Sequence, residues 1–188
     1  MYYYRQPSAR VVWYLIGINA LVFFITLPLP GLVFSLGLSP FTFDARPWTI
    51  ISSMFVHAGF GHILGNMFTL YFFGSYLLGL VGTRLFLITY LVGGLLGNIF
   101  LLLLAPLFPF TVAVGASGAV FAVGGALSVL RPKLRVYIFP IPAPIPLWIA
   151  VVGGFFILSL LPFVAWQAHL GGLLLGLGMG YKFRRDRY

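Results

Sequence analysis

The sequence contains no cysteine and no glutamate, and its only acidic residues are Asp44 and Asp186. Without cysteine the chain forms no disulfide framework and has no thiolate to serve as nucleophile or metal ligand. Two aspartates far apart in the sequence also exclude a mechanism that needs a pair of inward-facing carboxylates.

Charge of either sign is scarce. Charged residues make up 7% of the 188-residue chain, hydrophobic residues 61%, and the mean hydropathy is +1.08. A soluble domain is roughly half apolar and about a quarter charged, so a soluble enzyme, a disordered tail and a fibrous repeat are excluded. The composition instead predicts an all-α integral membrane protein, with residues 1–188 as a single domain in a lipid bilayer.

Six apolar runs predict six transmembrane helices. The last run is the least hydrophobic because it includes Gln167 and His169. The predicted spans are approximately 11–29, 59–82, 85–105, 114–130, 145–161 and 165–181.

The basic residues predict the orientation of these spans. The net charge of +9 comes from short clusters between the apolar runs, which argues against a nucleic-acid partner. With six spans, ten of the eleven basic residues fall on one side, leaving only Arg46 on the other. Since short cytoplasmic loops collect Lys and Arg, we expect both termini in the cytoplasm of a cell-membrane protein.

Two connecting segments are unusual. Residues 31–60 are too apolar and aromatic for an aqueous loop, so we expect them to lie partly in the outer leaflet with Trp48 at the interface. Residues 139–146 read FPIPAPIP and are too rich in proline to form a helix.

Polar residues from three predicted spans converge at one depth, just below the outer surface. His62 and Asn66 are four residues apart and so share one face of the second span. They could donate hydrogen bonds to a developing oxyanion, or instead hold neighbouring helices together. His57 precedes them and is expected to tie the outer loop to the second span, as structural support.

Ser117 and His169 are candidates for a catalytic pair. Ser117 lies in the small-residue run 115–119, which could serve helix packing or clear space for a substrate backbone. His169 is followed by a stripe of glycines, among them Gly172 and Gly176, that favours close contact with another helix. If the stripe packs on the fourth span, His169 can activate Ser117 for acyl transfer. No acidic residue is available at that depth, so the unit would be a Ser–His dyad.

A zinc site is the competing enzymatic interpretation. It would use His57, His62 and His169, but His57 and His62 are five residues apart rather than the four of a helical HExxH pair. There is also no glutamate to act as general base. We therefore expect no metal and no other cofactor.

Three motifs together resemble the rhomboid family of intramembrane serine proteases. They are HILGN at 62–66, GASGAVF at 115–121 and AHLGGLLLG at 168–176, and the resemblance covers essentially the whole chain. It implies a six-helix fold in which Ser117 is the nucleophile and His169 the base. It also implies that His62 and Asn66 flank the oxyanion, with Gly115 in the adjoining loop, and that residues 145–167 form a mobile gate and cap.

The chain departs from the family pattern at two places. It lacks the Trp-Arg pair of the outer loop, and Leu78 stands where many members carry an acid. The resemblance implies cleavage of transmembrane segments of other proteins near the outer face, and gives no oligomeric state. The alternatives are a non-catalytic relative that holds membrane clients, and a small transporter. A transporter would carry its polar groups near the midplane rather than near one face.

Overall fold

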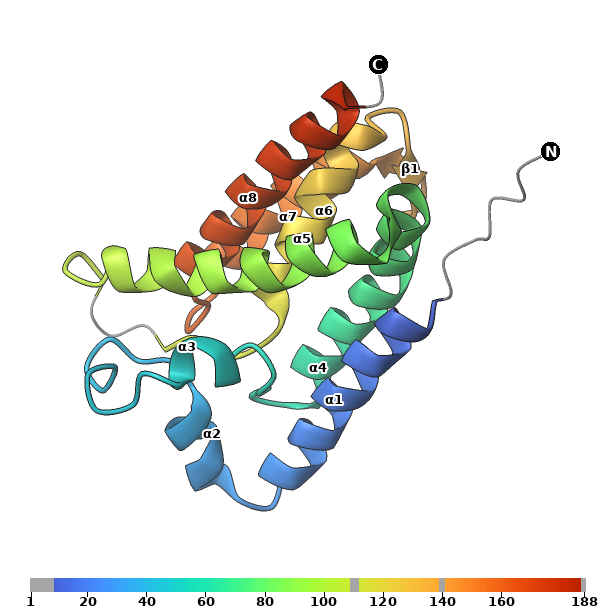
Figure 1. The fold of residues 1–188 in the computed structure, drawn as a ribbon. Coiled ribbons are helices and arrows are strands. Elements are labelled where there is room, and N and C mark those ends of the chain that lie inside the picture. The colour runs from blue at the N-terminus through green and yellow to red at the C-terminus, as the bar shows by residue number, and fades with distance from the viewer. Residues whose placement is uncertain (1–8, 109–111, 139–140, 187–188) are drawn as a thin grey trace.

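The computed structural model describes residues 9–108, 112–138 and 141–186 and is mainly helical (Figure 1). The N-terminal half contains α1 (Arg10–Thr26), α2 (Pro30–Leu36), α3 (Thr49–Ser52), α4 (Phe60–Thr69), a π-helical turn η1 (Leu70–Gly74) and α5 (Ser75–Leu103). The C-terminal half contains α6 (Ser117–Leu130), α7 (Leu147–Ser159) and α8 (Trp166–Arg185). Between α6 and α7, the two-residue strands β1 (Arg135–Val136) and β2 (Ile145–Pro146) pair antiparallel.

Helices lie within each of the six ranges predicted from the sequence. Among the described residues, one helical stretch, Phe60–Leu103, is long and apolar enough to cross a membrane by length and composition, and three shorter helices are also apolar. The number of spans therefore stays a prediction. Arg5, Arg187 and residues 139–140, on which parts of that topology rest, lie outside the described residues.

The long stretch is interrupted at Gly82, where the second predicted span ends. Gly82 has φ +80° and ψ 169°, a backbone conformation that glycine adopts without the steric cost a side chain would bring. The chain changes direction at the start of α5, so that most of α5 crosses the bundle while α4 runs alongside α1 (Figure 1). The two apolar segments can thus occupy different places in the bundle without a connecting loop.

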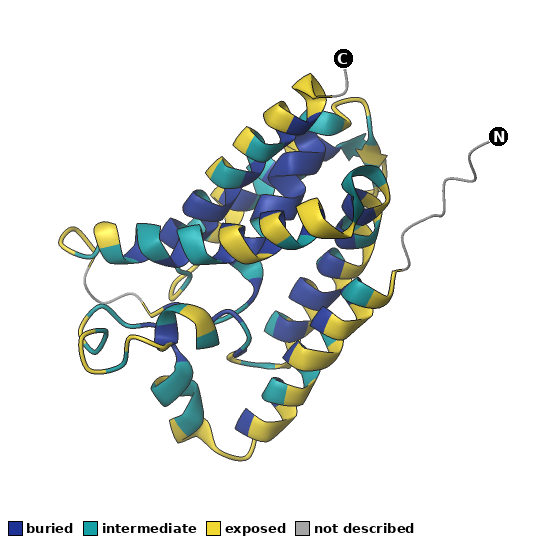
Figure 2. Ribbon diagram, viewed as in Figure 1, coloured by how far each residue is buried: buried dark blue, intermediate teal, exposed yellow. Residues whose placement is uncertain are grey.

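The core lies where α5, α6 and α8 pack against one another, and buried residues concentrate on these helices (Figure 2). On one side, a Cβ added at Gly172 or Gly176 would overlap backbone atoms of Gly118 or Ala122 of α6. On the other side, a Cβ at Gly171 would lie 2.8 Å from the carbonyl oxygen of Leu96 in α5. Only small residues permit helix backbones to approach this closely.

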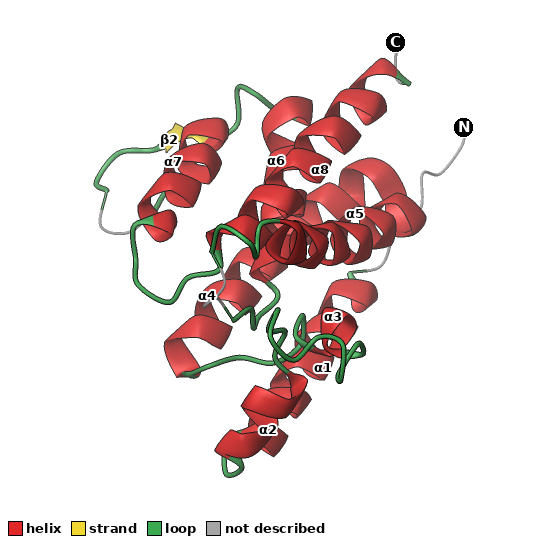
Figure 3. Ribbon diagram, turned by 90° about the vertical axis from the view of Figure 1, so that its left-hand side faces the viewer, coloured by secondary structure: helices red, strands yellow, loops and turns green. Residues whose placement is uncertain are grey.

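Two further segments flank this core. Turning the molecule by 90° shows α7 to one side of α6, joined to its neighbours by loops (Figure 3). The segment between α1 and α4 is anchored by a bridge in which Leu38 and Ala113 exchange backbone hydrogen bonds of 3.0 and 2.9 Å. The helix α6 begins at Ser117 and not at residue 114, where the fourth span was expected to start, because Gly115 has a non-helical φ of +111°.

Candidate active site

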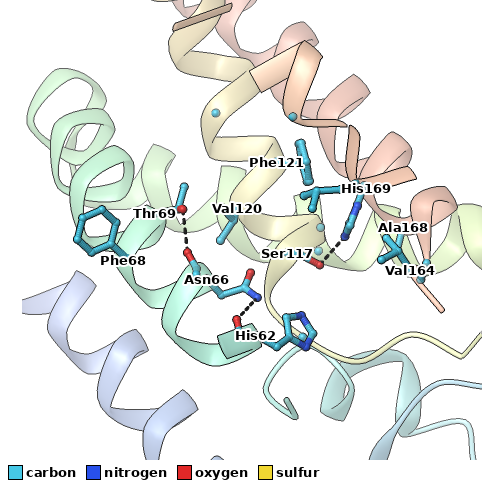
Figure 4. Close-up of a pocket in the computed structure, with 18 of the residues that line it drawn as sticks. His62, Asn66, Phe68, Thr69, Ser117, Val120, Phe121, Val164, Ala168 and His169 are labelled. Carbon is cyan, nitrogen blue, oxygen red and sulfur yellow. Dashed lines mark hydrogen bonds between the residues drawn. The ribbon is translucent and has the colours of Figure 1, made fainter. Parts of the chain in front are cut away.

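Ser117 and His169 are hydrogen-bonded to each other across the interface of α6 and α8. The Nε2 atom of His169 lies 2.8 Å from the Oγ atom of Ser117 (Figure 4). Ser117 is the first residue of α6, and His169 lies in the first turn of α8. Gly172 follows His169 by about one turn and contacts Gly118, the residue after Ser117. The close glycine contact therefore sets the separation of the two side chains.

The ring of His169 is held by packing. It is 6% exposed, and its centroid lies 4.7 Å from that of Phe121, one turn after Ser117 on α6, with 34° between the planes. Its Nδ1 atom is buried and has no hydrogen-bond partner among residues 9–108, 112–138 and 141–186. Within these residues the ring of His169 is therefore held by its contact with Phe121 and not by a third polar group.

Gly115 shapes the loop that precedes the nucleophile. Its φ of +111° lies in the region that favours glycine, and an added Cβ would be 2.6 Å from the Nε2 atom of His62. The absence of a side chain at this position allows the imidazole of His62 to approach the loop leading to Ser117. This close approach explains why glycine is required two residues before the serine.

His62 and Asn66 both face the cavity that contains the dyad (Figure 4). The Nδ2 atom of Asn66 donates a hydrogen bond of 2.9 Å to the backbone carbonyl of His62 in its own helix. An amide nitrogen carries two N–H groups, so this bond orients the side chain and leaves the second N–H for another acceptor. The structure thus brings both predicted oxyanion residues to the side of Ser117.

His57 is only 2% exposed and lies against the same loop. The backbone N–H of Ala116 donates to its Nε2 atom at 3.4 Å, and its ring meets that of His62 edge to face at 5.1 Å. Burial, followed by the nearby imidazole of His62, lowers the pKa of His57 to about 4. The ring is therefore neutral at neutral pH and can accept this bond. Sequence analysis expected His57 to tie the outer loop to the second span, whereas its hydrogen bond goes to the nucleophile loop.

A cavity of about 830 Å³ extends from the dyad between α4 and α7. Such a volume is in the range of pockets that bind sizeable organic ligands. Glycines form part of its walls, and aromatic side chains of α4 and η1 form another part. Wall residues from these helices include Gly65, Phe68, Phe72, Gly154 and Leu158.

The three histidines are not arranged as a metal centre. Within the described ranges, no group of three or more His, Cys, Asp or Glu side chains could hold a metal ion. His169 is bonded to Ser117, and His57 accepts from a backbone amide. The geometry groups these side chains around a serine.

Asn98 and Ser53 also belong to the surroundings of the site, although sequence analysis did not select them. The Nδ2 atom of Asn98 in α5 donates to the Oγ atom of Ser53 at 2.9 Å, and the backbone carbonyl of Ser53 accepts the N–H of Gly115 at 2.8 Å. A polar side chain inside a predicted span was the available signal, because such residues are costly in a membrane unless they have a role.

Comparison with known proteins identifies relatives of this chain. Residues 44–186 match the family model of the Rhomboid domain. The chain is 29% identical to Rhomboid protein 1, mitochondrial, of Saccharomyces cerevisiae, over 95% of this chain and 55% of the relative. It is 34% identical to RHOMBOID-like protein 6, mitochondrial, of Arabidopsis thaliana, over 71% of this chain and 43% of the relative. It is 32% identical to RHOMBOID-like protein 12, mitochondrial, of the same plant, over 77% of this chain and 49% of the relative. The chain thus spans about half the length of these relatives.

The expected location in a cell membrane is wrong. All three relatives are named as mitochondrial proteins, which points away from a cell membrane. The expectation rested on clusters of basic residues, and these indicate on which side of a membrane a loop lies but not which membrane it is. The assignment of the termini to the cytoplasm depended on the cell-membrane location and is therefore also withdrawn. The side that carries ten of the eleven basic residues in the predicted six-span arrangement is called the basic side below.

Proposed function

Because the chain belongs to the rhomboid family, we propose that it is an intramembrane serine endopeptidase that cleaves transmembrane segments of other membrane proteins. The observation that carries this proposal is the 2.8 Å contact between the Nε2 atom of His169 and the Oγ atom of Ser117. A serine is a weak nucleophile unless an adjacent base accepts its proton, and this contact provides such a base.

The geometry supports acyl transfer in two steps. Nε2 of His169 takes the proton of Ser117 as Oγ bonds to the scissile carbonyl carbon. The tetrahedral intermediate then collapses, the C–N bond breaks, and Nε2 gives the proton to the leaving amine. Water then hydrolyses the acyl-enzyme: Nε2 removes its proton as the water oxygen bonds to the carbonyl carbon. The second tetrahedral intermediate collapses, the bond between this carbon and Oγ of Ser117 breaks, and Nε2 gives the proton to Oγ.

His62 and Asn66 stabilise the oxyanion in this proposal. Both side chains lie on the cavity wall with Ser117, and Asn66 retains an N–H beyond the one bonded to His62. The N–H groups at the start of α6 have no intrahelical acceptor, so the backbone of Ser117 supplies a further donor. Gly115 contributes by leaving room for the His62 ring beside the loop.

Six spans, with both termini on the basic side, are the membrane arrangement that we propose for the single domain. The opposite directions of α1 and α8 agree with this, as the first and last of six spans must be antiparallel (Figure 1). The dyad then lies toward the face opposite the basic side, because His169 is near the start of α8 and the basic residues Lys182, Arg184 and Arg185 are at its end.

The cavity between α4 and α7 is the proposed route of the substrate, with α7 and the loop after it as gate and cap. Phe163 in that loop is fully exposed, has φ +62° and lines the cavity. A bulky residue in this backbone region is strained, which is common in segments that change conformation. Water would enter from the same face to hydrolyse the acyl-enzyme.

Cleavage of a reporter protein with one transmembrane segment tests the proposal. Wild-type protein in proteoliposomes should cleave it, and Ser117→Ala and His169→Ala should reduce cleavage to background without loss of folding. Ser128→Ala is the matched control, because within the described part of the chain this buried serine of α6 bonds only the carbonyl of Gly124 in its own helix. EDTA should have no effect. Cleavage by Ser117→Ala, or a wild-type chain that binds the reporter without cutting it, would contradict the proposal; the second result would favour a client-binding protein.

A further inference from the structure

A buried amide in α5 connects to the nucleophile loop through hydrogen bonds to residues far away in the sequence. The Nδ2 atom of Asn98 donates to the backbone carbonyl of Ile50 at 2.7 Å and to the Oγ atom of Ser53 at 2.9 Å. Asn98 is 5% exposed. A buried amide is costly unless it is hydrogen-bonded, and these two acceptors use both of its N–H groups. The segment around Ser53 is therefore fixed against α5.

Ser53, which Asn98 holds in place, is in turn hydrogen-bonded to the loop before Ser117. Its backbone carbonyl accepts the N–H of Gly115 at 2.8 Å, and Gly115 is two residues before the nucleophile. The φ of Gly115 is +111°, so the loop leaves this residue in a direction that depends on where its N–H is held. A shift of the Ser53 carbonyl would move the start of α6, where Ser117 lies.

The neighbouring residue of α5 contacts the helix of the base. A Cβ at Gly97 would overlap the backbone carbonyl of Ala168, the residue before His169. Consecutive residues of α5 thus touch the nucleophile side and the base side of the dyad. This helix is the common support against which Ser117 and His169 are placed relative to each other.

We propose that Asn98 is a positioning residue, which holds the Gly115 loop through Ser53 and so keeps Oγ of Ser117 at reacting distance from His169. The inference rests on the proposed protease function. Asn98 also lines the cavity, so the competing role is direct contact with the substrate. A positioning role acts on the chemical step and lowers kcat, whereas a substrate contact made equally before and in the transition state acts on KM.

The test compares Asn98→Leu with Thr89→Val. Leucine has nearly the shape of asparagine but no donors. Thr89 is also buried in α5, but among the residues that the structure describes its hydroxyl bonds only the carbonyl of Leu85 in its own helix, at 2.8 Å. We expect Asn98→Leu to lower kcat on the order of 10²-fold, as a misplacement of about 1 Å does, with KM unchanged. Thr89→Val should leave both constants unchanged.

Reaction of Ser117 with a fluorophosphonate supplies a readout that does not depend on binding a transmembrane segment. Its rate should fall in Asn98→Leu by the same factor as kcat, while the melting temperature of Asn98→Leu stays near that of Thr89→Val. Ser53→Ala removes the Oγ acceptor but keeps the carbonyl that binds Gly115. Its kcat and labelling rate should therefore fall less than those of Asn98→Leu. The double variant should lose no more than Asn98→Leu alone, because both changes break one network.

Several results would overturn the inference. If the wild type is active and Asn98→Leu is equally active, the positioning role is contradicted while the protease function stands. The same holds if Asn98→Leu raises KM but leaves kcat and the labelling rate unchanged. Additive losses in the double variant would contradict the shared network. If Asn98→Leu does not fold, Ser53→Ala decides, and a labelling rate equal to wild type refutes the proposal. A folded wild type that neither cleaves nor labels refutes the protease function, and the positioning role with it.

Discussion

Two sets of glycines in this molecule have opposite surroundings. Three glycines of α8 lie against α6: added Cβ atoms at Gly172 and Gly176 would overlap backbone, and one at Gly180 would lie 2.6 Å from the carbonyl oxygen of Ala126. By contrast, Gly65 of α4 and Gly154 of α7, two of the glycines on the cavity wall, have nothing within 4 Å of an added Cβ. The same residue type thus closes one helix interface and leaves another open. The closed interface holds the dyad together, and the open one leaves room for a ligand.

The largest effect is expected at the closed interface. Gly172→Leu and Gly176→Leu should lower the cleavage rate by at least about 10²-fold and reduce the melting temperature, because the side chain forces α8 away from α6. Alanine should be milder than leucine at each position but not neutral, since even its Cβ meets backbone. Cleavage assays and thermal melting measure both effects. Wild-type behaviour of both leucine variants would show that the stripe does not set the position of His169.

An intermediate effect is expected from the oxyanion residues on the open side. Removing one donor from a fully preorganised oxyanion site costs about 10²–10³ in rate. Asn66→Ala and His62→Ala should each cost less than this, because the other side chain, the backbone of Ser117 and water share the charge. The melting temperature should change little, and kcat should carry the loss. Complete inactivation of both folded variants would instead indicate that α4 supplies the nucleophile or the base.

A smaller effect on the cleavage rate is expected when a side chain is added to an open glycine on the cavity wall. Gly154→Leu should fold normally, because nothing lies within 4 Å, and should slow cleavage of a transmembrane reporter by about tenfold through obstruction of the cavity. Its reaction with a small fluorophosphonate should be unchanged. Gly153→Leu is the matched control, since this neighbour also has open space but does not line the cavity. Equal cleavage rates for Gly154→Leu and Gly153→Leu would show that the substrate does not pass through the cavity.

The contact between Ser117 and His169 could be predicted because the two residues lie in local patterns. Ser117 stands in a run of small residues, and His169 begins a glycine stripe, so each motif could be recognised without knowing its neighbours. The helical ranges could be predicted from hydropathy, and the backbone is interrupted at Gly82, where φ is +80°. These features arise from residues close together in the chain.

Features that depend on distant residues could not be predicted in this way. The bond between Asn98 and Ser53 joins residues 45 apart, and no periodicity reports such a pairing. The bridge between Leu38 and Ala113 also joins residues far apart in the chain, and the π-helical turn at Leu70–Gly74 leaves no distinct pattern. The location was predicted wrongly because basic clusters carry no information about the identity of a membrane.

The most direct test of the account is whether Ser117 is an activated nucleophile. Detergent-solubilised protein would be treated with a fluorophosphonate, and the modified residue identified by mass spectrometry. The account predicts an adduct on Ser117 in the wild type, none at this position in Ser117→Ala, and a strongly reduced rate in His169→Ala, because the 2.8 Å contact supplies the base. A folded wild-type protein that is not labelled at Ser117, or equal labelling rates in wild type and His169→Ala, would contradict it.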